Sequence, residues 1–178
     1  MMRLSNDLFT VVLNADSHFE ISDDHPGYDI ILNPESFEPD DTYITCRIEI
    51  TKEGSTKTIG LISPLGTDFH DMAVLKENRL FVLIYQAVYE IDLDHPETCS
   101  YHPVMPDGFS HGIFLHDDRY LIYSTYAVLC LDEKFREQWI FSTDAPITVF
   151  KITDERIELV DEDDNRHFVT FEGKRMMR

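Results

Sequence analysis

The sequence predicts an all-β protein built from antiparallel meanders. Its apolar runs are short and are separated by Asp-rich breaks, a pattern that suits strands rather than helices. No segment has convincing helical periodicity. A stretch of about 40 residues also occurs more than once, and repeats of that length with four strands each are typical of propeller blades. We therefore expect propeller-like repeat units that follow a strand-rich N-terminal portion.

The N-terminal portion contains one clear β-hairpin. Residues 42–51 alternate between a polar side and an apolar side that carries Ile44, Cys46, Ile48 and Ile50. The turn is expected at 52–55 and the returning strand at 58–62, which gives a sheet with one solvated face. Three shorter strands are expected at residues 8–13, 18–21 and 28–32.

The segment Ser63-Pro64-Leu65-Gly66 is the best candidate boundary, because Pro and Gly interrupt regular structure. It divides a hairpin- or sandwich-like portion, residues 1–63, from the repeats, residues 64–178. A single continuous domain stays open as an alternative. Residues 95–111 carry three prolines and are expected to form a loop or an irregular edge.

Residues 112–142 are expected to hold four strands in a meander, at 113–115, 120–123, 127–131 and 138–141. A shift of 40 positions superimposes residues 72–92 on 112–132 with five identities, where average composition would give about one or two. Asp92 and Asp132 are one such pair, and Arg79 and Arg119 another. A weaker third copy is expected to include residues 167–172.

The run from Tyr126 to Asp132, followed by Trp139, resembles the blade motif of the pyrroloquinoline-quinone-type and WD-type repeat families. The resemblance covers about residues 72–171 and implies a propeller-like architecture. The turn departs from those families, because Lys134-Phe135-Arg136 stands where a Gly is usual. The blade motif does not mark quinone-binding residues, so the resemblance implies no cofactor.

Composition narrows the classes of function. The chain has 178 residues, with 15 Lys and Arg against 34 Asp and Glu, and its formal net charge is −19. Such a charge disfavours nucleic acid and anionic membranes, and it suits a basic protein partner or simple solubility. Three cysteines without a C-x-x-C motif, and no secretion signal or membrane span, favour the cytoplasm. Three repeats form an open array, whose edges the N-terminal part or a second copy would cover.

Residues 108–112 match the G-x-S-x-G nucleophile elbow, with Ser110 as the candidate nucleophile and His111 and His116 nearby. The elbow requires a strand before the serine and a helix after it. Prolines precede this motif and a strand is expected after it, so a Gly-bounded turn is the simpler interpretation. A small-molecule-binding protein or hydrolase that uses this loop is the alternative function.

Two groups of residues have metal-ligand chemistry. His95, Cys99 and His102 offer soft or borderline ligands, although their spacing matches no standard zinc motif. A second group fits positions 1, 3, 5 and 12 of a calcium loop, but Arg166 stands where that loop needs Gly. This group consists of Asp161, Asp163, Asn165 and Glu172. A solvated loop and a hairpin turn are the simpler interpretations.

The function that the sequence favours is a non-enzymatic protein-interaction or scaffold module with a strongly acidic surface. An immunity- or antitoxin-like protein, which neutralises a basic toxin by charge complementarity, is one form of it. Exposed aromatic side chains and acidic runs are the candidate interface, since both are common at binding surfaces. The candidate interface residues are Phe109, Tyr126, Phe135, Asp161, Glu162, Asp163 and Asp164.

Overall fold

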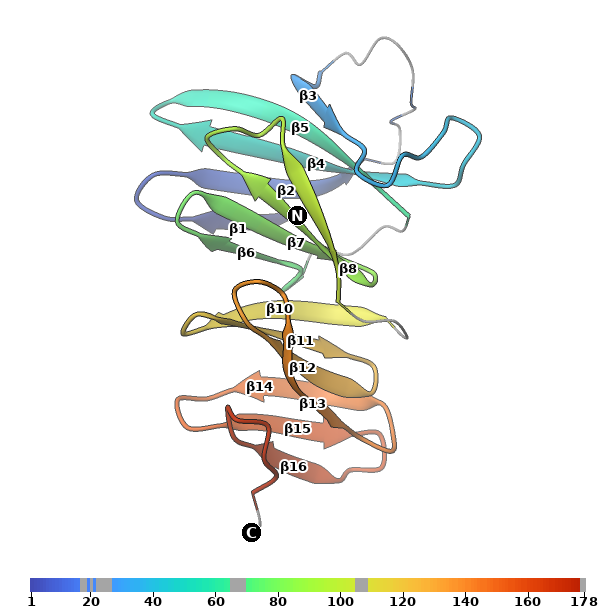
Figure 1. The fold of residues 1–178 in the computed structure, drawn as a ribbon, viewed down its shortest axis with the longest axis vertical. Coiled ribbons are helices and arrows are strands. Elements are labelled where there is room, and N and C mark those ends of the chain that lie inside the picture. The colour runs from blue at the N-terminus through green and yellow to red at the C-terminus, as the bar shows by residue number, and fades with distance from the viewer. Residues whose placement is uncertain (17–18, 20, 22–26, 65–69, 105–108, 177–178) are drawn as a thin grey trace. The chain divides into compact units, whose positions relative to one another are not determined.

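The computed structural model describes residues 1–16, 19, 21, 27–64, 70–104 and 109–176. Within these residues the protein is all-β and forms four separate sheets (Figure 1). The expected fold class is thereby confirmed. No helix in the described residues is long and apolar enough to cross a membrane.

The chain divides into two compact units, residues 1–106 and 107–178. The expected boundary after Ser63 falls inside the first unit, between two of its sheets. Contacts within the first unit join those sheets, since Lys52 Nζ lies 2.6 Å from Asp94 Oδ1 and the Asn6 side chain donates to the Glu77 carbonyl.

The first sheet of unit 1 has the strand order β1-β2-β4-β5-β3. Its central pair is the expected hairpin, in which Cys46, Ile48 and Ile50 are buried. The short strand β3 pairs in parallel with β5, a long-range pairing that the local sequence pattern did not indicate. The strands are β1 (Met2–Ser5), β2 (Thr10–Asp16), β3 (Ile30–Leu32), β4 (Ile44–Lys52) and β5 (Ser55–Ser63).

The second sheet of unit 1 is an antiparallel meander of four strands. Its two central strands are almost wholly buried, as their continuous apolar sequences require. The proline-containing segment that was expected to be a loop or an irregular edge contains the edge strand of this sheet, with Pro103 as its last residue. The strands are β6 (Ala73–Lys76), β7 (Arg79–Ile84), β8 (Ala87–Asp92) and β9 (Cys99–Pro103).

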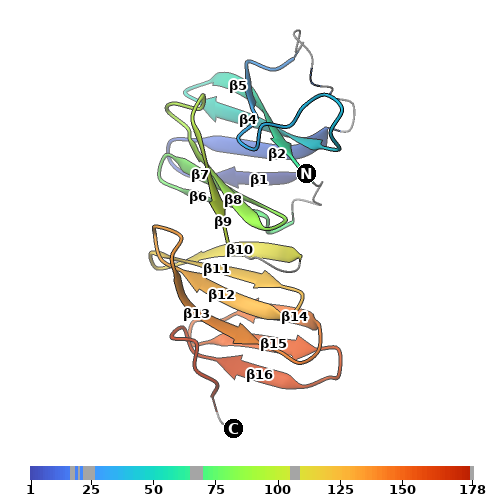
Figure 2. The same cartoon turned by 45° about the vertical axis from the view of Figure 1, so that its right-hand side comes forward.

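Unit 2 contains a four-stranded meander and a three-stranded meander, which Figure 2 shows as successive sheets of this unit. Side chains from both sheets share one core, in which Leu121 and Val128 meet Ile157 and Leu159. Trp139 and Phe171 pack against this core. The strands are β10 (Ser110–His116), β11 (Arg119–Ser124), β12 (Ala127–Leu131), β13 (Glu137–Ser142), β14 (Ile147–Ile152), β15 (Ile157–Asp161) and β16 (Arg166–Val169).

The 40-residue repeat corresponds to whole sheets. Strands β6–β8 and β10–β12 occupy matching positions in their sheets, and each hairpin turn between the first two strands begins with a residue of left-handed backbone. Those residues are Glu77 (φ 54°) and Asp117 (φ 51°), which are 40 positions apart. In the third copy, β16 takes the place of β12 as the third strand of its meander.

Candidate functional site

The turn between β15 and β16 is built around the carboxylate of Asp161. This side chain is only 3% exposed. Its Oδ1 accepts hydrogen bonds from the backbone N–H of Asp163 (3.1 Å) and of Asn165 (2.9 Å), and Asp164 has a left-handed φ of 61°. Aspartate is suited to this position because its short side chain bonds to backbone donors a few residues ahead.

The other carboxylate oxygen of Asp161 faces β16. Oδ2 lies 2.9 Å from His167 Nε2 and accepts a further bond from the Asn165 side chain at 3.1 Å. The hydrogen bond from His167 holds the pKa of the Asp161 carboxyl below its ordinary value, and the bonds from Asn165 act in the same direction. Asp161 therefore ties the turn to the following strand while it stays ionised.

His167 is bonded on both ring nitrogens. Its Nδ1 lies 3.0 Å from Arg175 Nη2. A guanidinium can only donate, so Nδ1 is the acceptor and Nε2 carries the proton that it donates to Asp161. The ring is thereby held in one neutral tautomer between a carboxylate and a guanidinium.

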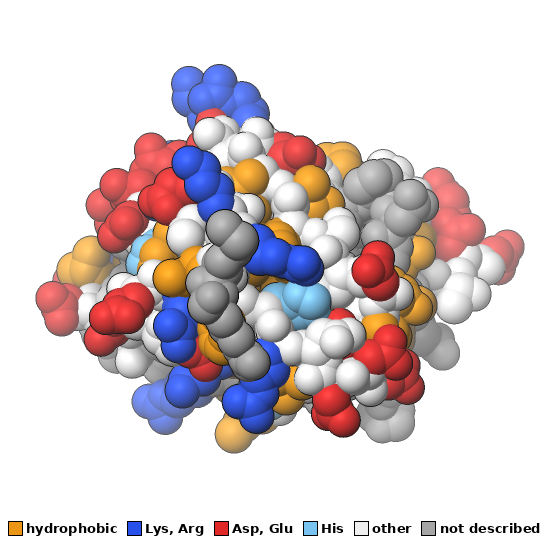
Figure 3. All heavy atoms as spheres, turned by 90° about the horizontal axis from the view of Figure 1, so that it is seen from below, with side chains coloured by type: hydrophobic (Ala, Val, Ile, Leu, Met, Phe, Trp, Pro, Cys, Tyr) orange, Lys and Arg blue, Asp and Glu red, His pale blue; other side chains and the backbone are white. Residues whose placement is uncertain are grey.

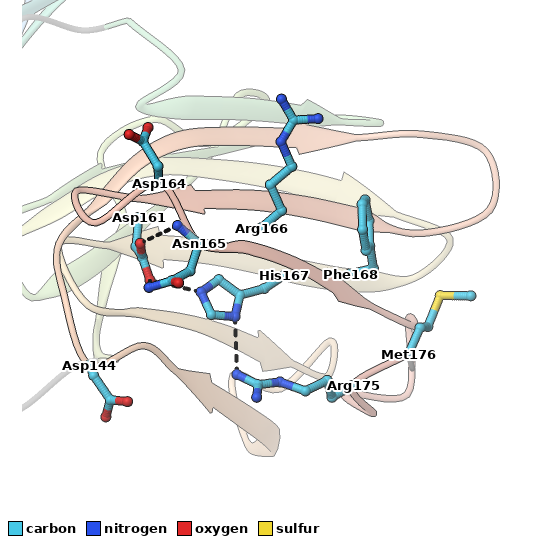
Figure 4. A pocket seen from close by; sticks show the side chains of 9 residues that line it. All are labelled: Asp144, Asp161, Asp164, Asn165, Arg166, His167, Phe168, Arg175 and Met176. Atoms are coloured by element: carbon cyan, nitrogen blue, oxygen red, sulfur yellow. Dashed lines mark hydrogen bonds and ion pairs between the residues drawn. The ribbon is translucent and has the colours of Figure 1, made fainter. Parts of the chain in front are cut away.

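A cavity of about 700 Å³ lies beside this chain of bonds. Figure 4 shows its acidic side chains, Asp144, Asp161 and Asp164, on one side and Arg166 and Arg175 on the other, with His167 between them. Phe168 and Met176 add apolar surface near the arginines. The cavity is a polar groove whose two sides carry opposite charge.

The four acids of the candidate interface have different surroundings. Glu162, Asp163 and Asp164 are exposed, whereas Asp161 is buried and engaged by the turn and by His167. Asp161 thus holds the turn that carries the exposed acids, and its own carboxylate is not on the surface. The difference follows from strand alternation, because Asp161 lies on the same face of β15 as the buried Ile157 and Leu159.

The three aromatic candidates also differ. Phe109 is 58% exposed and Tyr126 is 50% exposed, values that suit surface contacts. Phe135 instead stacks on the buried ring of Tyr120, with centroids 4.8 Å apart. Its role in the structure is to close the β12–β13 turn over the core.

The candidate zinc ligands are not brought together as a metal site. His102 Nε2 lies 3.0 Å from Glu90 Oε2, the ring of His95 is exposed, and the thiol of Cys99 is directed to the Ser100 carbonyl. Among the described residues, no group of three or more His, Cys, Asp or Glu side chains is arranged to hold a metal ion.

The residues that fit a calcium loop by spacing belong to two different turns. Asp161, Asp163 and Asn165 form the β15–β16 turn, in which Asp161 accepts hydrogen bonds from the other two. Glu172 lies in the turn that follows β16, where its backbone N–H bonds to Thr170 Oγ1. The spacing of these polar residues is explained by the needs of two turns.

The G-x-S-x-G serine lies in a strand. Ser110 is buried at the start of β10 and opposite Ser124, and the His111 ring nitrogen Nε2 lies 3.0 Å from Thr125 Oγ1. The chain continues as an antiparallel strand and not as a helix, so the backbone geometry of a nucleophile elbow is not formed here.

His167 and Arg175 are the site residues that sequence reasoning missed. The sequence pattern includes His167 in the expected third copy of the repeat but predicts no role for it or for Arg175. Strand alternation could have indicated His167, because it shares the inner face of β16 with the buried Val169. The contact with Arg175 depends on how the chain folds back after Gly173 and has no local signature.

On the face of the molecule drawn in Figure 3, acidic side chains are interspersed with Lys and Arg and do not form one continuous patch. This face is therefore not uniformly acidic, although the formal net charge of the chain is −19. Acidity is locally concentrated in turns such as residues 162–164.

Comparisons with known proteins identify the fold. No family model matches the chain, and no curated protein sequence matches it. BamB from Moraxella catarrhalis matches with a TM-score of 0.52 and 13% identity over 76% of this chain and 46% of BamB. The computationally designed Ika8 protein matches with a TM-score of 0.54 and 10% identity over 79% of this chain and 46% of Ika8.

The HIRA(644-1017) structure matches with a TM-score of 0.51 and 8% identity over 98% of this chain and 51% of HIRA(644-1017). BamB and HIRA are β-propeller proteins. The chain therefore has a propeller-type repeat fold, and it spans about half the length of each of these structures. At such low identities the likeness concerns the fold alone.

Proposed function

We propose that this protein is a non-enzymatic protein-interaction module that binds a basic protein partner through acidic turns. The observation that carries the proposal is the β15–β16 turn, in which three consecutive exposed acids follow a buried aspartate that fixes the turn. Binding groups on loops held by a rigid scaffold are common, because the scaffold positions them without further ordering.

Charge complementarity supports a basic partner. The chain carries 34 acidic and 15 basic residues, so a basic protein is attracted over long range before contact. An immunity- or antitoxin-like protein that neutralises a basic toxin is one form of this function. The exposed rings of Phe109 and Tyr126 would supply apolar contacts, because aromatic side chains often dominate the energy of an interface.

A cytoplasmic setting goes with this proposal. Cys46, Cys99 and Cys130 are free thiols, and Cys46 and Cys130 are buried. Buried thiols are compatible with a compartment that keeps cysteines reduced. Burial also raises the pKa of Cys46 and Cys130, which makes both thiols less reactive.

The test is affinity capture of the tagged protein from its own host, with two variants compared with the parent. The first variant combines Glu162→Gln, Asp163→Asn and Asp164→Asn. The matched control combines Glu137→Gln, Asp154→Asn and Glu155→Gln, which removes the same charge from exposed acids of the same unit. We expect a stoichiometric partner with a basic isoelectric point that is captured by the parent and by the control. The turn variant should capture about tenfold less of this partner, or less still.

Equal retention by both variants would refute the role of the turn. Recovery of the protein without any stoichiometric partner would refute the interaction function itself. Neither set includes a buried side chain, so we expect both variants to keep the fold. Circular dichroism of each variant checks this.

A further inference from the structure

Asp161, His167 and Arg175 form a chain of three charged or titratable groups that crosses from β15 through β16 to the C-terminal segment. Asp161 Oδ2 is 2.9 Å from His167 Nε2, and His167 Nδ1 is 3.0 Å from Arg175 Nη2. The side chain of His167 is 11% exposed, so water has little access to its inner edge. This arrangement goes beyond the proposed binding function, because none of the three groups is an exposed acid of the turn.

The Asp161 end of this chain is fixed. Besides His167, the carboxylate accepts bonds from the Asp163 and Asn165 backbones and from the Asn165 side chain. Because the carboxylate is buried and already accepts three other bonds, it keeps its bond to His167 Nε2 when the ring takes up a proton. A proton added to the ring must therefore go to Nδ1, the nitrogen that faces the guanidinium.

The Arg175 end cannot accept that proton. Protonated Nδ1 would place an N–H donor of a cationic ring against a cationic donor at 3.0 Å. An arginine has no acceptor and stays charged at all accessible pH values. The contact is attractive with the neutral ring and repulsive with the protonated ring.

Arg175 anchors the segment that follows β16. This segment pairs with the end of β16 at the Val169–Arg175 bridge, where the Met176 N–H donates to the Phe168 carbonyl at 2.8 Å and the Thr170 N–H donates to the Lys174 carbonyl at 2.9 Å. The Lys174 N–H also donates to Thr170 Oγ1 at 3.3 Å. The guanidinium also lies over the Phe141 ring, 5.5 Å from its centroid. Its bond to His167 adds a polar side-chain contact between the segment and the inner face of β16.

The remaining groups around His167 do not reverse this effect. Phe141 of β13 meets the ring edge-on at 5.9 Å and is apolar. The charged groups that line the same groove are Asp144, Asp161, Asp164, Arg166 and Arg175. Asp144 and Asp164 lie on the other side of this groove from Arg175 (Figure 4).

We propose that His167 is a proton-operated latch, which holds Arg175 and the segment 174–176 against β16 when neutral and releases them when protonated. Acidification adds this proton to the ring and so operates the latch. Release frees the Phe168 carbonyl, which accepts a hydrogen bond from the Met176 N–H in the latched state.

The test is hydrogen exchange of the Met176 amide, followed by NMR at about pH 8 and about pH 5.5, together with the nitrogen shifts of the His167 ring. We expect the proton on Nε2 at the higher pH and a doubly protonated ring at the lower pH. Met176 should lose protection about tenfold or more at the lower pH, after correction for intrinsic exchange, while the amide of Leu159 in β15 keeps its protection.

Two variants isolate the latch. His167→Gln can donate to Asp161 and accept from Arg175 but cannot be protonated, so Met176 should be equally protected at both pH values. His111→Gln removes an exposed histidine of the same unit and should behave like the parent. A proton on Nδ1 at pH 8, unchanged protection of Met176, the same loss of protection in His167→Gln, or an equal loss at Leu159 would each overturn the proposal.

Discussion

At the scale of single residues, Asp161 and Gly173 define the two ends of β16. Asp161 fixes the turn before this strand, and Gly173 makes the turn after it with a φ of 77°. Trp139 lies directly against Gly173, and its indole N–H donates to the Phe171 carbonyl at 3.0 Å. The tryptophan of β13 thus packs on the turn that closes the next sheet of unit 2.

Gly173→Ala is expected to destabilise unit 2 by more than the usual cost of a left-handed residue, which is about 1–2 kcal/mol. The added Cβ would lie 2.6 Å from the Cγ and Cδ2 atoms of Trp139, so the indole would also have to move. Urea unfolding followed by fluorescence measures this directly, because Trp139 is the only tryptophan of the chain.

Gly54→Ala is the matched control for the backbone cost. Gly54 has a similar φ of 81°, but nothing lies within 4 Å of the position that its Cβ would take. Its substitution, followed by circular dichroism, should cost only about 1–2 kcal/mol. If Gly173→Ala lowers the free energy of unfolding by no more than Gly54→Ala does, the claim that Trp139 packs closely on this turn is wrong.

The residues of the candidate site were only partly predictable from the sequence. The run from Asp161 to Asp164 looks uniform, but strand alternation separates its first member, which faces inward, from the exposed acids that follow. The partner of His167 could not be predicted, because Arg175 reaches it through a turn whose path depends on Trp139 and Gly173.

At the scale of structural elements, several strands end in a short polar side chain that caps the next turn. Asp132 follows β12, and its Oδ1 accepts from the backbone N–H of Lys134 and Arg136. After β16, Thr170 has the same role, with bonds from the backbone of Glu172 and Lys174. The capping function is thus retained in the third copy, although the residue type differs.

Asp132→Asn should lower stability near neutral pH and have little effect in strong acid. The Arg136 side chain, followed by its backbone N–H, lowers the pKa of Asp132 to about 2. Because the pKa of an unfolded aspartate is about 3.9, the ionised carboxylate stabilises the fold above that pH, and this contribution is lost as the pH falls toward about 2. Urea midpoints of the parent and the variant should therefore converge between about pH 4 and about pH 2.

Asp154→Asn is the control for this pH dependence. Asp154 is exposed in the neighbouring β14–β15 turn, so its substitution should leave the urea midpoint close to that of the parent throughout. A difference between Asp132→Asn and the parent that stays constant down to pH 2 would contradict the role of the ionised carboxylate.

The strands of the central meander and of the N-terminal hairpin were predicted closely. Strands β10 to β13 were found within about three residues of their ends, because apolar runs between Asp-rich turns mark them. Strand β14 was not predicted, although its sequence is rich in the β-branched and aromatic residues that favour strands. The parallel pairing of β3 with β5 is long-range and depends on how the segment between β3 and β4 folds.

At the scale of the whole molecule, the fold and the charge carry different information. The propeller-type fold, shared with structures at 8–13% identity, says how the turns are displayed but not what they bind. The proposed binding function depends on the excess of acidic residues and on the fixed acidic turn, which attract a basic partner.

The most direct test of that function is the association rate of the captured partner as a function of salt. For the parent, the rate constant should fall about tenfold or more between about 20 mM and about 300 mM salt, because screening removes long-range attraction. The variant with Glu162→Gln, Asp163→Asn and Asp164→Asn should associate more slowly at low salt and depend less on salt, while its dissociation rate changes little. Equal rates and salt dependence for the parent and this variant would contradict the claim that the acidic turn recruits the partner.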